Sequence, residues 1–437
     1  MPSSCVLCGF AVAMGRWLPW AQRPDLQLMR IGILTHNYPR FPGDFSGVFM
    51  QQLCEELARQ GESVHVIAPF DPAYTADILS GSNPRLHLYR YAWPPRAHTL
   101  GYMRTMRADV RMRLSTYFLS PAFFLSGYLA ALRVARKQAL DLLHAHWVLP
   151  NGYLGALVSK RLNIPLVVSI PGSDALVAAQ NPIFRAMART AFQRAALITA
   201  NSRALQRVAV DELGADPDKF ELVIYAVDPD RLRPDPTGVL QLRQKLGIPE
   251  NAFVFLAVGR MVYKKGFDIL IHALAQIQQR TADLPRPVHT IMVGEGDLWH
   301  AWQELARRLG VENIHWVGNI PTHEMSVYYN AADVLVMPNV TRPATGLGVT
   351  VLDAMACGKA IIGSDTAGNP LVVEHGLNGY IVPEGDASAL ARAMLDLAEQ
   401  PARAAAMGEA SRRLIETRFG WPHVVRHYRR RYREIVS

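Results

Sequence analysis

Short apolar runs alternate with segments of helical periodicity along almost the whole chain. In the first half, Phe49, Leu53 and Leu57 recur every four residues, and Gly61 follows as a helix-ending glycine. Around this helix stand seven runs short enough for strands buried on both faces: Arg30–Thr35, Ser63–Ala68, Leu86–Tyr91, Leu140–His146, Leu166–Ile170, Leu197–Ala200 and Leu222–Tyr225. The alternation of strand and helix predicts a mostly parallel sheet with helices on both faces.

The alternation breaks once and then restarts. Residues 228–238, DPDRLRPDPTG, hold three prolines, and proline is excluded from helix interiors and central strands. Six further strands are expected after this break: Phe253–Val258, Val288–Val293, Asn313–Val317, Val334–Met337, Ala360–Gly363 and Tyr380–Val382. We therefore predict an α/β fold of two Rossmann-like doubly wound domains, 29–230 and 242–419, joined by a linker at 231–241. Such sheets bind ligands at the carboxyl ends of their strands, so a central cleft is expected there.

Size and composition agree with two soluble domains. The 437 residues exceed one ordinary core, and half of them are hydrophobic while 19% are charged. The four cysteines form no disulfide framework, which favours a reducing, cytoplasmic location. Residues 1–28 show neither period nor helix caps, and we expect them to be a disordered extension that precedes the fold.

The net charge of +9 is concentrated in one segment. Between Arg85 and Lys137 stand ten basic residues and one acid, while the rest of the chain carries 36 of each sign. The same segment contains the aromatic stretch LSTYFLSPAFFLSGYLAAL, whose Pro121 and Gly127 make a poor membrane span. A basic, aromatic surface resting on an anionic membrane fits residues 85–137. The alternative is a helix pair that packs into its own domain with a solvated basic face. Nucleic acid is disfavoured, because no nucleic-acid module accompanies the charge.

The stretch TGLGVTVLDAMACG, from Thr345 to Gly358, carries the strongest chemical signal. Two glycines precede a run typical of a buried helix, and the free amide groups of a helix N-terminus can hold a phosphate. Asp353, one to two turns further on, is placed to take a sugar hydroxyl. The alternative is a buried helix with a glycine-containing entry.

A second element precedes the first helix of the second domain. In VGRMVYKKGF, Arg260 and Lys265 stand five residues apart on a strand-to-helix loop. A guanidinium and an ammonium at this place would neutralise a diphosphate. The alternative is that Arg260 and Lys265 are two solvated loop cations. This alternative becomes weaker because the loop and the stretch Thr345–Gly358 both lie at strand ends of the same predicted sheet.

Several other chemistries are disfavoured by missing motifs. The chain has no GxxxxGK[ST], GxSxG or HExxH sequence, and Gly294-Glu-Gly296 lacks the third glycine of a dinucleotide fingerprint. The runs Asp216–Asp218 and Asp228–Asp230 hold proline at their centre, which favours turns over a metal-binding DxD. We therefore expect a metal-independent mechanism without a bound cofactor.

Three loops follow strands in the first domain and should line the cleft: THNYPRFPGDFSG, HAHW and PGSD. His146 ends a strand, and we place it on the cleft side with His144 on the opposite face. A strand-end histidine is more often a structural hydrogen-bonding group than a catalyst, so both roles remain open for His146.

Together these motifs resemble those of family 4, GT-B type, retaining glycosyltransferases, over nearly all of 29–437. The carriers are VGRMVYKKGFDIL, VGEGDL, HWVGNIP, YYNAADVLVMPN, TGLGVTVLDAMACGKAIIGSD and AGNPLVVEHGLNGYIV. The resemblance implies a C-terminal domain that binds a nucleotide-diphosphate sugar, with UDP or GDP as the nucleotide. It also implies an N-terminal acceptor domain to which the last helix, 420–437, crosses back.

The resemblance further implies roles for individual residues. The catalytic set is His146, Arg260, Lys265 and Thr345. The donor-binding set is Arg260, Lys265, Asn319, Ile320, Thr345, Gly346, Leu347, Gly348 and Asp353. On the acceptor side stand Gly43, Gly47 and Asp174.

The chain departs from the family pattern at several positions. Thr345 and Asp353 stand where the family has two glutamates, and Thr345 thereby loses a charged contact with the donor sugar. Pro171 replaces a common histidine ahead of Gly-Ser-Asp. We expect the protein to transfer a sugar to a polysaccharide or a lipid-linked glycan by same-face attack. We expect it to do so in the cytoplasm or at the inner face of the membrane. The alternative from Thr345 is a nucleotide-sugar-binding partner protein with weakened catalysis.

Overall fold

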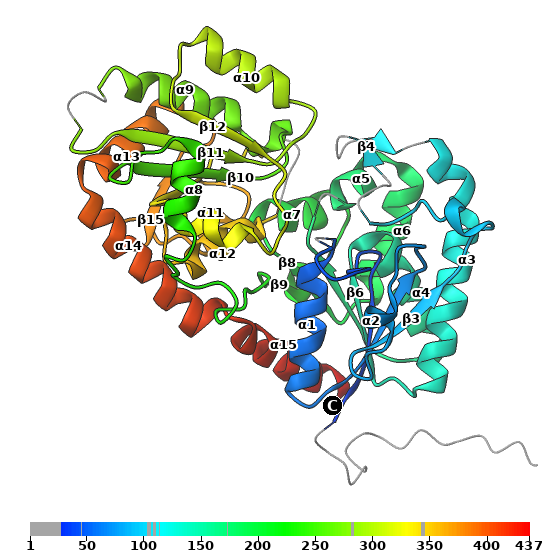
Figure 1. The fold of residues 1–437 in the computed structure, drawn as a ribbon. Coiled ribbons are helices and arrows are strands. Elements are labelled where there is room, and N and C mark those ends of the chain that lie inside the picture. The colour runs from blue at the N-terminus through cyan, green and yellow to red at the C-terminus, as the bar shows by residue number, and fades with distance from the viewer. Residues whose placement is uncertain are drawn as a thin grey trace, which may run out of the picture.

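Two parallel sheets, each covered by helices, face one another in the computed structural model (Figure 1). The structure describes residues 28–437 except 45, 103–105, 108–110, 113, 173, 281–283 and 342–345, and it describes no side chains between 103 and 117. The extension expected at 1–28 therefore lies almost wholly outside the described residues.

The N-terminal sheet has the strand order β3-β2-β1-β6-β7-β8-β9, and all its pairs are parallel. Its strands are β1 (Arg30–Leu34), β2 (Ser63–Pro69), β3 (Arg85–Tyr89), β6 (Leu142–His146), β7 (Leu166–Ile170), β8 (Leu197–Ala200) and β9 (Phe220–Leu222). The helices are α1 (Val48–Arg59), α2 (Ala76–Leu79), α3 (Leu114–Lys137), α4 (Tyr153–Leu162), α5 (Asp174–Gln180), α6 (Pro182–Arg194) and α7 (Arg203–Arg207). A short antiparallel pair, β4 (Met106–Arg107) and β5 (Arg111–Met112), precedes α3. The predicted βα alternation is confirmed.

The C-terminal sheet repeats the pattern with the order β12-β11-β10-β13-β14-β15. Its strands are β10 (Phe253–Val258), β11 (Val288–Val293), β12 (Ile314–Gly318), β13 (Val334–Met337), β14 (Ala360–Ser364) and β15 (Gly379–Val382). The helices are α8 (Val239–Leu246), α9 (Phe267–Gln278), α10 (Trp299–Arg308), α11 (Met325–Ala331), α12 (Val349–Ala356), α13 (Ala387–Glu399) and α14 (Pro401–Leu414). Its inner strands are buried along their whole length, which explains their continuous apolar runs.

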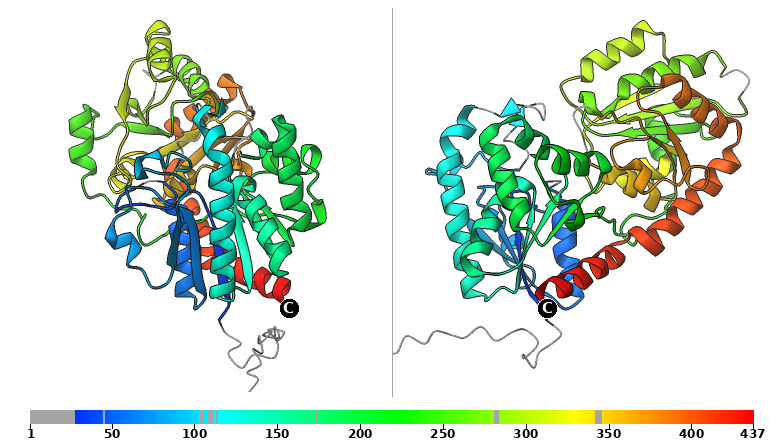
Figure 2. Two further views of the ribbon diagram at one scale, coloured as in Figure 1. Left: turned by 90° about the vertical axis from the view of Figure 1, so that its right-hand side faces the viewer. Right: turned by 180° about the vertical axis from the view of Figure 1, so that it is seen from behind.

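The last helix, α15 (Trp421–Val436), returns to the N-terminal domain (Figure 2). Its buried face holds Trp421, Val424, Val425, Tyr428 and Tyr432. These side chains pack with α1 residues and with one face of the N-terminal sheet in a single apolar cluster. The helix therefore buries its apolar face as part of the N-terminal domain, while its basic face stays outward.

Turns account for the two Asp-Pro-Asp runs. The side chain of Asp216 accepts a hydrogen bond from the amide of Asp218 (3.0 Å), and Asp228 accepts one from the amide of Asp230 (2.9 Å). Both are the short-range bonds by which aspartate stabilises turns. The expectation of turns is confirmed at these positions.

Candidate active site

Each sheet has one point at which its strand order reverses, and open parallel sheets bind ligands there. In the C-terminal sheet this point lies between β10 and β13. The loop after β10 and the loop after β13 therefore meet at one edge. They carry most of the residues expected to contact the donor.

Gly266 brings these two loops together. It has a φ of 62° at the start of α9, and a Cβ there would lie 1.9 Å from the carbonyl oxygen of Pro338. Only glycine accommodates both this left-handed conformation and this approach. Across the same contact, the amide of Val340 donates to the carbonyl of Lys264 (3.1 Å). The backbone that carries Lys265 is thus fixed against the loop after β13.

Lys265 crosses from the first loop toward the second. A Cβ on Gly259 would lie 2.9 Å from its Cε, so the lysine side chain passes directly over that glycine. A Cβ on Gly348 would lie 3.6 Å from its Nζ. The ammonium group is therefore beside the start of α12, which begins at Gly348 without a side-chain cap. A cation and the first amides of a helix converge here, as an anion site requires.

Arg260 lies on the same loop and is exposed. The loop is held in place from the β11 side, because the amide of Met261 donates to the carbonyl of Glu295 (2.9 Å). Gly294 permits this approach, since a Cβ on it would lie 2.1 Å from the carbonyl oxygen of Gly259. The backbone beside Arg260 is thus held against the loop that follows β11.

Thr350 is a site residue that the sequence did not predict. Its Oγ1 is buried and has no hydrogen-bond partner among the described residues. The same oxygen would lie 3.3 Å from a Cβ on Gly348, on the first turn of α12. Its one sequence signal is a hydroxyl residue two positions after the second glycine of the loop.

Asp353 and Asn319 occupy the flank of this site. The hydroxyl of Tyr329 donates to Oδ2 of Asp353 (3.2 Å), and burial raises the pKa of the aspartate carboxyl to about 7. Asn319 follows β12 and donates from Nδ2 to Glu295 (3.0 Å), while the neighbouring Ile320 packs against the apolar cluster that includes α12. Thr345, the remaining expected donor contact, lies outside the described residues.

The two domains touch at the glycine loop. The amide of Leu347 donates to the carbonyl of Asn201 (3.3 Å), which directly follows β8. A Cβ on Gly346 would lie 2.0 Å from Oδ1 of that asparagine, and one on Gly368 would lie 2.4 Å from its carbonyl oxygen. Gly346 and Gly368 therefore allow the donor loop to close against the N-terminal domain.

On the N-terminal side, the loop after β1 is held by its own polar residues. The guanidinium of Arg40 donates two hydrogen bonds to the carboxylate of Asp44 (2.6 and 3.2 Å), and Asp44 is buried. Gly47 caps α1 at a φ of 77°, and a Cβ there would lie 2.6 Å from the carbonyl oxygen of Asn37. Gly43 also has a positive φ (88°) but faces open space. The two glycines shape the loop, and Asp44 stabilises it.

His146 is enclosed by the N-terminal domain. Its side chain is fully buried, and its Nδ1 lies 3.0 Å from the hydroxyl of Tyr225. Burial holds its pKa well below the ordinary value, so the ring is neutral. Its Nε2 is buried with no hydrogen-bond partner among the described residues, and a catalytic role for His146 stays a prediction.

The assignment of His144 to the face opposite His146 is wrong. The rings of His144 and His146 lie 4.0 Å apart, since side chains two residues apart in a strand share a face. His144 bonds to Tyr432 of α15 through Nδ1 (2.6 Å) and to Ser169 through Nε2 (2.6 Å). Both rings therefore belong to the interior layer beneath α15.

Asp174 begins α5 at the end of the loop that follows β7. Its Oδ2 accepts a hydrogen bond from the amide of Val148 (2.6 Å), and burial raises the pKa of its carboxyl to about 7. It thereby joins the loops that follow β6 and β7. The carboxyl fixes the backbone at this edge of the N-terminal sheet.

Comparison with known proteins identifies the family. The profile of Glycosyltransferase Family 4 matches residues 46–231, and that of Glycosyl transferases group 1 matches residues 239–414. A D-inositol 3-phosphate glycosyltransferase of Streptomyces scabiei is 30% identical over 317 residues, which cover 68% of this chain and 69% of that protein. The chain belongs to glycosyltransferase family 4. As a member of that family it is a glycosyltransferase of the hexosyltransferase type.

A second relative of this family 4 glycosyltransferase comes from Mycolicibacterium smegmatis. It is a GDP-mannose-dependent alpha-(1-6)-phosphatidylinositol monomannoside mannosyltransferase, 33% identical over 244 residues. That match covers 54% of this chain and 62% of the relative.

Solved structures confirm the GT-B fold. The HepE protein of Anabaena, crystallised with UDP, superposes with a TM-score of 0.69 at 21% identity, covering 93% of this chain and all of that one. A glycosyltransferase from Rickettsia africae gives a TM-score of 0.70 at 17% identity, covering 94% of this chain and 99% of that one. At these identities the likeness establishes the fold.

Proposed function

We propose that the chain is a retaining, metal-independent glycosyltransferase that uses a nucleotide-diphosphate sugar, with UDP or GDP as the nucleotide. The observation that carries the proposal is the position of the Lys265 ammonium beside Gly348 and the uncapped start of α12. Arg260 adds a second cation at the same strand ends. Two cations and the free amides of a helix start together suit the binding of a diphosphate.

The reaction follows from this arrangement. As the bond between C1 of the sugar and the phosphate oxygen breaks, negative charge grows on the leaving diphosphate. Lys265, Arg260 and the amides of α12 stabilise that charge, which lowers the barrier. The acceptor oxygen then bonds to C1 from the same face, and its proton passes to the leaving phosphate oxygen.

The carboxylates of the site support same-face attack over a double displacement. A covalent intermediate requires a carboxylate free to attack C1. Asp44 is bonded to Arg40, Asp174 to the amide of Val148, and Asp353 to Tyr329. Each of these three has a structural partner, although Oδ1 of Asp174 is buried without one among the described residues.

Nucleotide binding and turnover test the proposal. Thermal-shift measurements with UDP-, GDP- and ADP-sugars should show stabilisation, which is about 2.7 kcal/mol for a ligand at 100 times its Kd. Absence of any shift would contradict the donor site. A comparison of the transfer activity of the native chain with that of the Thr345→Glu variant then distinguishes an enzyme from a nucleotide-sugar-binding partner protein. Transfer by the variant alone would favour the partner protein.

For the acceptor, we propose a polysaccharide or lipid-linked glycan met at the inner face of the membrane. The M. smegmatis relative is named for a phosphatidylinositol-linked acceptor. In this chain, α3 buries Phe123 and Ala131 against the N-terminal domain. Its other face exposes Phe118 (86%), Leu125 (60%) and Leu129 (48%), at positions that share one side of a helix.

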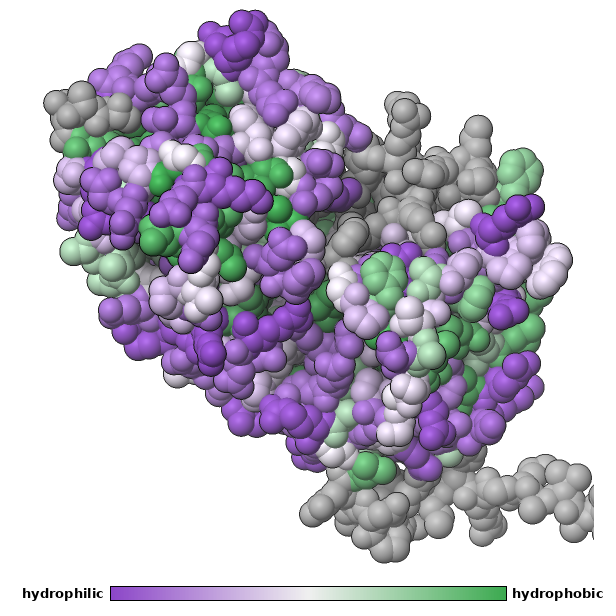
Figure 3. Space-filling view, in the orientation of Figure 1, coloured by the Kyte–Doolittle hydropathy of each residue, from purple (hydrophilic) through white to green (hydrophobic). Residues whose placement is uncertain are grey.

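Basic residues continue this face of α3. Arg133, Arg136 and Lys137 are exposed at the end of the helix. Apolar residues also show green on the right of Figure 3, the side on which Figure 1 places α3. The segment Phe118–Lys137 is apolar and long enough to cross a membrane, with 28% of its window buried in the protein. Apolar and basic groups on one surface favour lateral contact with anionic lipid.

Vesicle flotation tests this contact. The protein should float with anionic vesicles, and replacing Phe118, Leu125 and Leu129 by serine should leave it in the soluble fraction. Ile183→Ser is the matched control, because this residue of α6 is 69% exposed but lies outside α3. Equal flotation of the triple variant and the native chain would refute the lipid contact.

A further inference from the structure

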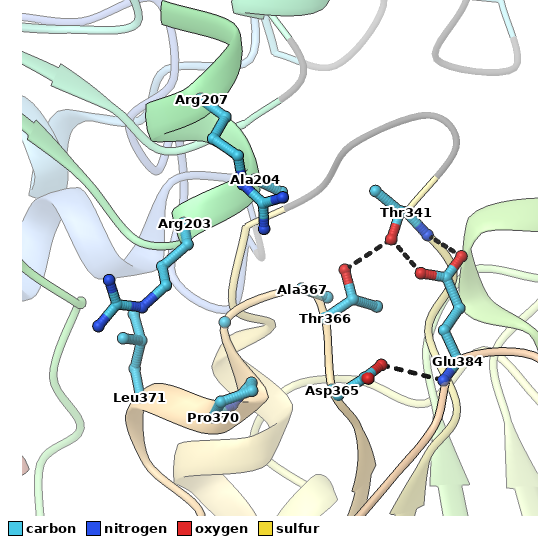
Figure 4. A pocket seen from close by; sticks show the side chains of 11 residues that line it. Arg203, Ala204, Arg207, Thr341, Asp365, Thr366, Ala367, Pro370, Leu371 and Glu384 are labelled. Atoms are coloured by element: carbon cyan, nitrogen blue, oxygen red, sulfur yellow. Dashed lines mark hydrogen bonds between the residues drawn. The ribbon is translucent and has the colours of Figure 1, made fainter. Parts of the chain in front are cut away.

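A cavity of about 270 Å³ lies between the two domains (Figure 4). One wall is α7 of the N-terminal domain. The other wall is built by loops that follow β13, β14 and β15 of the C-terminal domain. The cavity is therefore displaced from the point between β10 and β13 where the diphosphate site lies. None of the residues that line it is used in the stabilisation of the leaving diphosphate described above.

The N-terminal wall presents two arginines. Arg203 and Arg207 stand four residues apart on α7, and both are exposed; in Figure 4 the guanidinium of Arg203 lies on the side of Leu371 and that of Arg207 on the side of Ala367. Neither guanidinium has a hydrogen bond or an ion pair with any described residue. The helix itself is fixed, because Ser202 caps it by accepting a hydrogen bond from the amide of Leu205 (3.2 Å). Two cations are thus held at the cavity without a partner in the described part of the chain.

The C-terminal wall presents oxygen atoms that are already ordered. Glu384 accepts hydrogen bonds from the amide (2.6 Å) and the hydroxyl of Thr341. The hydroxyls of Thr341 and Thr366 lie 3.0 Å apart. Asp365 accepts from the amide of Glu384 (2.9 Å), which holds its carboxylate at the cavity edge. Glu384 and Asp365 are therefore hydrogen-bonded within the C-terminal domain.

We propose that this cavity binds a small phosphorylated polyol, with its phosphate on Arg203 and Arg207 and its hydroxyl groups on Asp365 and Thr366. Guanidinium groups bind phosphate through paired charge-assisted hydrogen bonds. A carboxylate and a hydroxyl on the facing wall match the hydroxyls of a sugar ring. The volume is near the lower end of ligand pockets, which suits one ring and one phosphate.

The ligand would bridge both domains beside the donor loop. Gly368 lines the cavity, and the same residue contacts Asn201 and Leu347. Two sources share this chemistry: an acceptor that carries a phosphate, or a metabolite that regulates the enzyme. The first source rests on the proposed function, while the second requires only the cavity.

Calorimetric titration of the full chain tests the site, with D-glucose 6-phosphate, inorganic phosphate and uncharged D-glucose as probes. Replacing Arg203 and Arg207 by glutamine should weaken binding of both phosphates roughly tenfold to a hundredfold, because charge-assisted bonds are lost. The control replaces Lys160 and Arg161 by glutamine. These exposed cations of α4 belong to the same domain but do not line the cavity, so affinity should stay unchanged.

Asp365→Asn separates the two ends of the site. It should weaken D-glucose 6-phosphate binding several-fold and leave inorganic phosphate unchanged, since only the polyol reaches the second wall. Equal binding of the phosphates by the arginine variant and the native chain would overturn the proposal. So would a native chain that binds neither phosphate. Circular dichroism melting of each variant excludes loss of folding as the cause.

Mass spectrometry after incubation with the nucleotide-sugar donor distinguishes the sources. A phosphorylated probe that gains a sugar is an acceptor, and one that changes the transfer rate without gaining a sugar is an effector. Either result supports the site. Failure of the native chain to bind any nucleotide would refute the proposed function, whereas phosphate binding through Arg203 and Arg207 would still stand.

Discussion

The two sheets have the same strand order around their reversal points, yet their loops use polar residues differently. In the N-terminal domain, Asp44 is bonded to Arg40, and His146 is buried against Tyr225. In the C-terminal domain, Lys265 passes over one glycine toward a second, beside an uncapped helix start. The shared topology supplies an edge where loops meet. The side chains decide whether that edge stabilises the fold or receives a ligand.

The strongest test of this contrast is the charge at the C-terminal edge. Lys265→Gln should lower kcat/KM by roughly 10²–10³, because a preorganised group that stabilises the leaving diphosphate is lost. Steady-state kinetics with the preferred nucleotide sugar measures the effect. Lys245→Gln, an exposed lysine on α8, is the control and should be neutral. An unchanged rate in the Lys265 variant would remove the basis for calling this edge the ligand side.

A second test concerns the glycine that holds the two C-terminal loops together. Gly266→Ala should lower the free energy of unfolding by roughly 2–4 kcal/mol, since a Cβ would strike the carbonyl of Pro338 at a positive φ. Gly247 has a similar φ of 69° but open space around it, so Gly247→Ala should cost only about 1 kcal/mol. Urea unfolding compares the two. Equal losses would mean that the contact with Pro338 does not constrain the loop.

The sequence predicted local structure well where one physical cause dominates. The strands Leu166–Ile170 and Val288–Val293 have the predicted limits, because central strands are continuous apolar runs between turns. The last strand of the first domain begins at Phe220 and ends at Leu222 rather than at Tyr225. It lies at the sheet edge and is half-buried, so its apolar signal is weaker.

The candidate site was only partly predictable. Glycines and cations of one domain pointed to the edge where Lys265 meets Gly348, since both loops follow strands of one sheet. The contact of Asn201 with Gly346 was missed, as were Arg203 and Arg207. These depend on how two domains meet, over long separations in sequence, and no local period records that. The face of His144 was predicted wrongly although the strand was right.

Acid should affect the two domains unequally. Burial lowers the pKa of His144 to about 3 and that of His36 to about 4, both in the N-terminal domain. As the pH falls, these two histidines therefore become protonated in the unfolded chain at a higher pH than in the folded chain. Stability from His144 is complete above about pH 6.5 and falls as pH drops toward 3, by ~2 kcal/mol at pH 5.

Two aspartates act in the opposite direction. Burial raises the pKa of Asp174 and Asp353 to about 7, so their contribution is present at low pH and is lost as pH rises from about 4 to 7. One lies in each domain, so the comparison between domains is little changed. Hydrogen exchange at pH 5.0 and 7.5, corrected for intrinsic rates, should show weaker protection in β1 and β6 than in β10 and β13 at the lower pH. Equal loss in both sheets would contradict the contrast.

The smallest expected effect concerns the buried hydrogen bonds beneath α15. The hydroxyl of Tyr432 lies 2.6 Å from Nδ1 of His144, and both side chains are fully buried. Tyr432→Phe leaves the imidazole nitrogen without that partner, and it should lower the free energy of unfolding by about 1–2 kcal/mol. Tyr128→Phe on α3, where no hydrogen bond to a described residue is broken, should change it little. Nucleotide affinity should be the same in both variants, because this network lies on the structural side of the comparison. A Tyr432 variant of native stability but weakened nucleotide binding would reverse that assignment and connect α15 to the donor site.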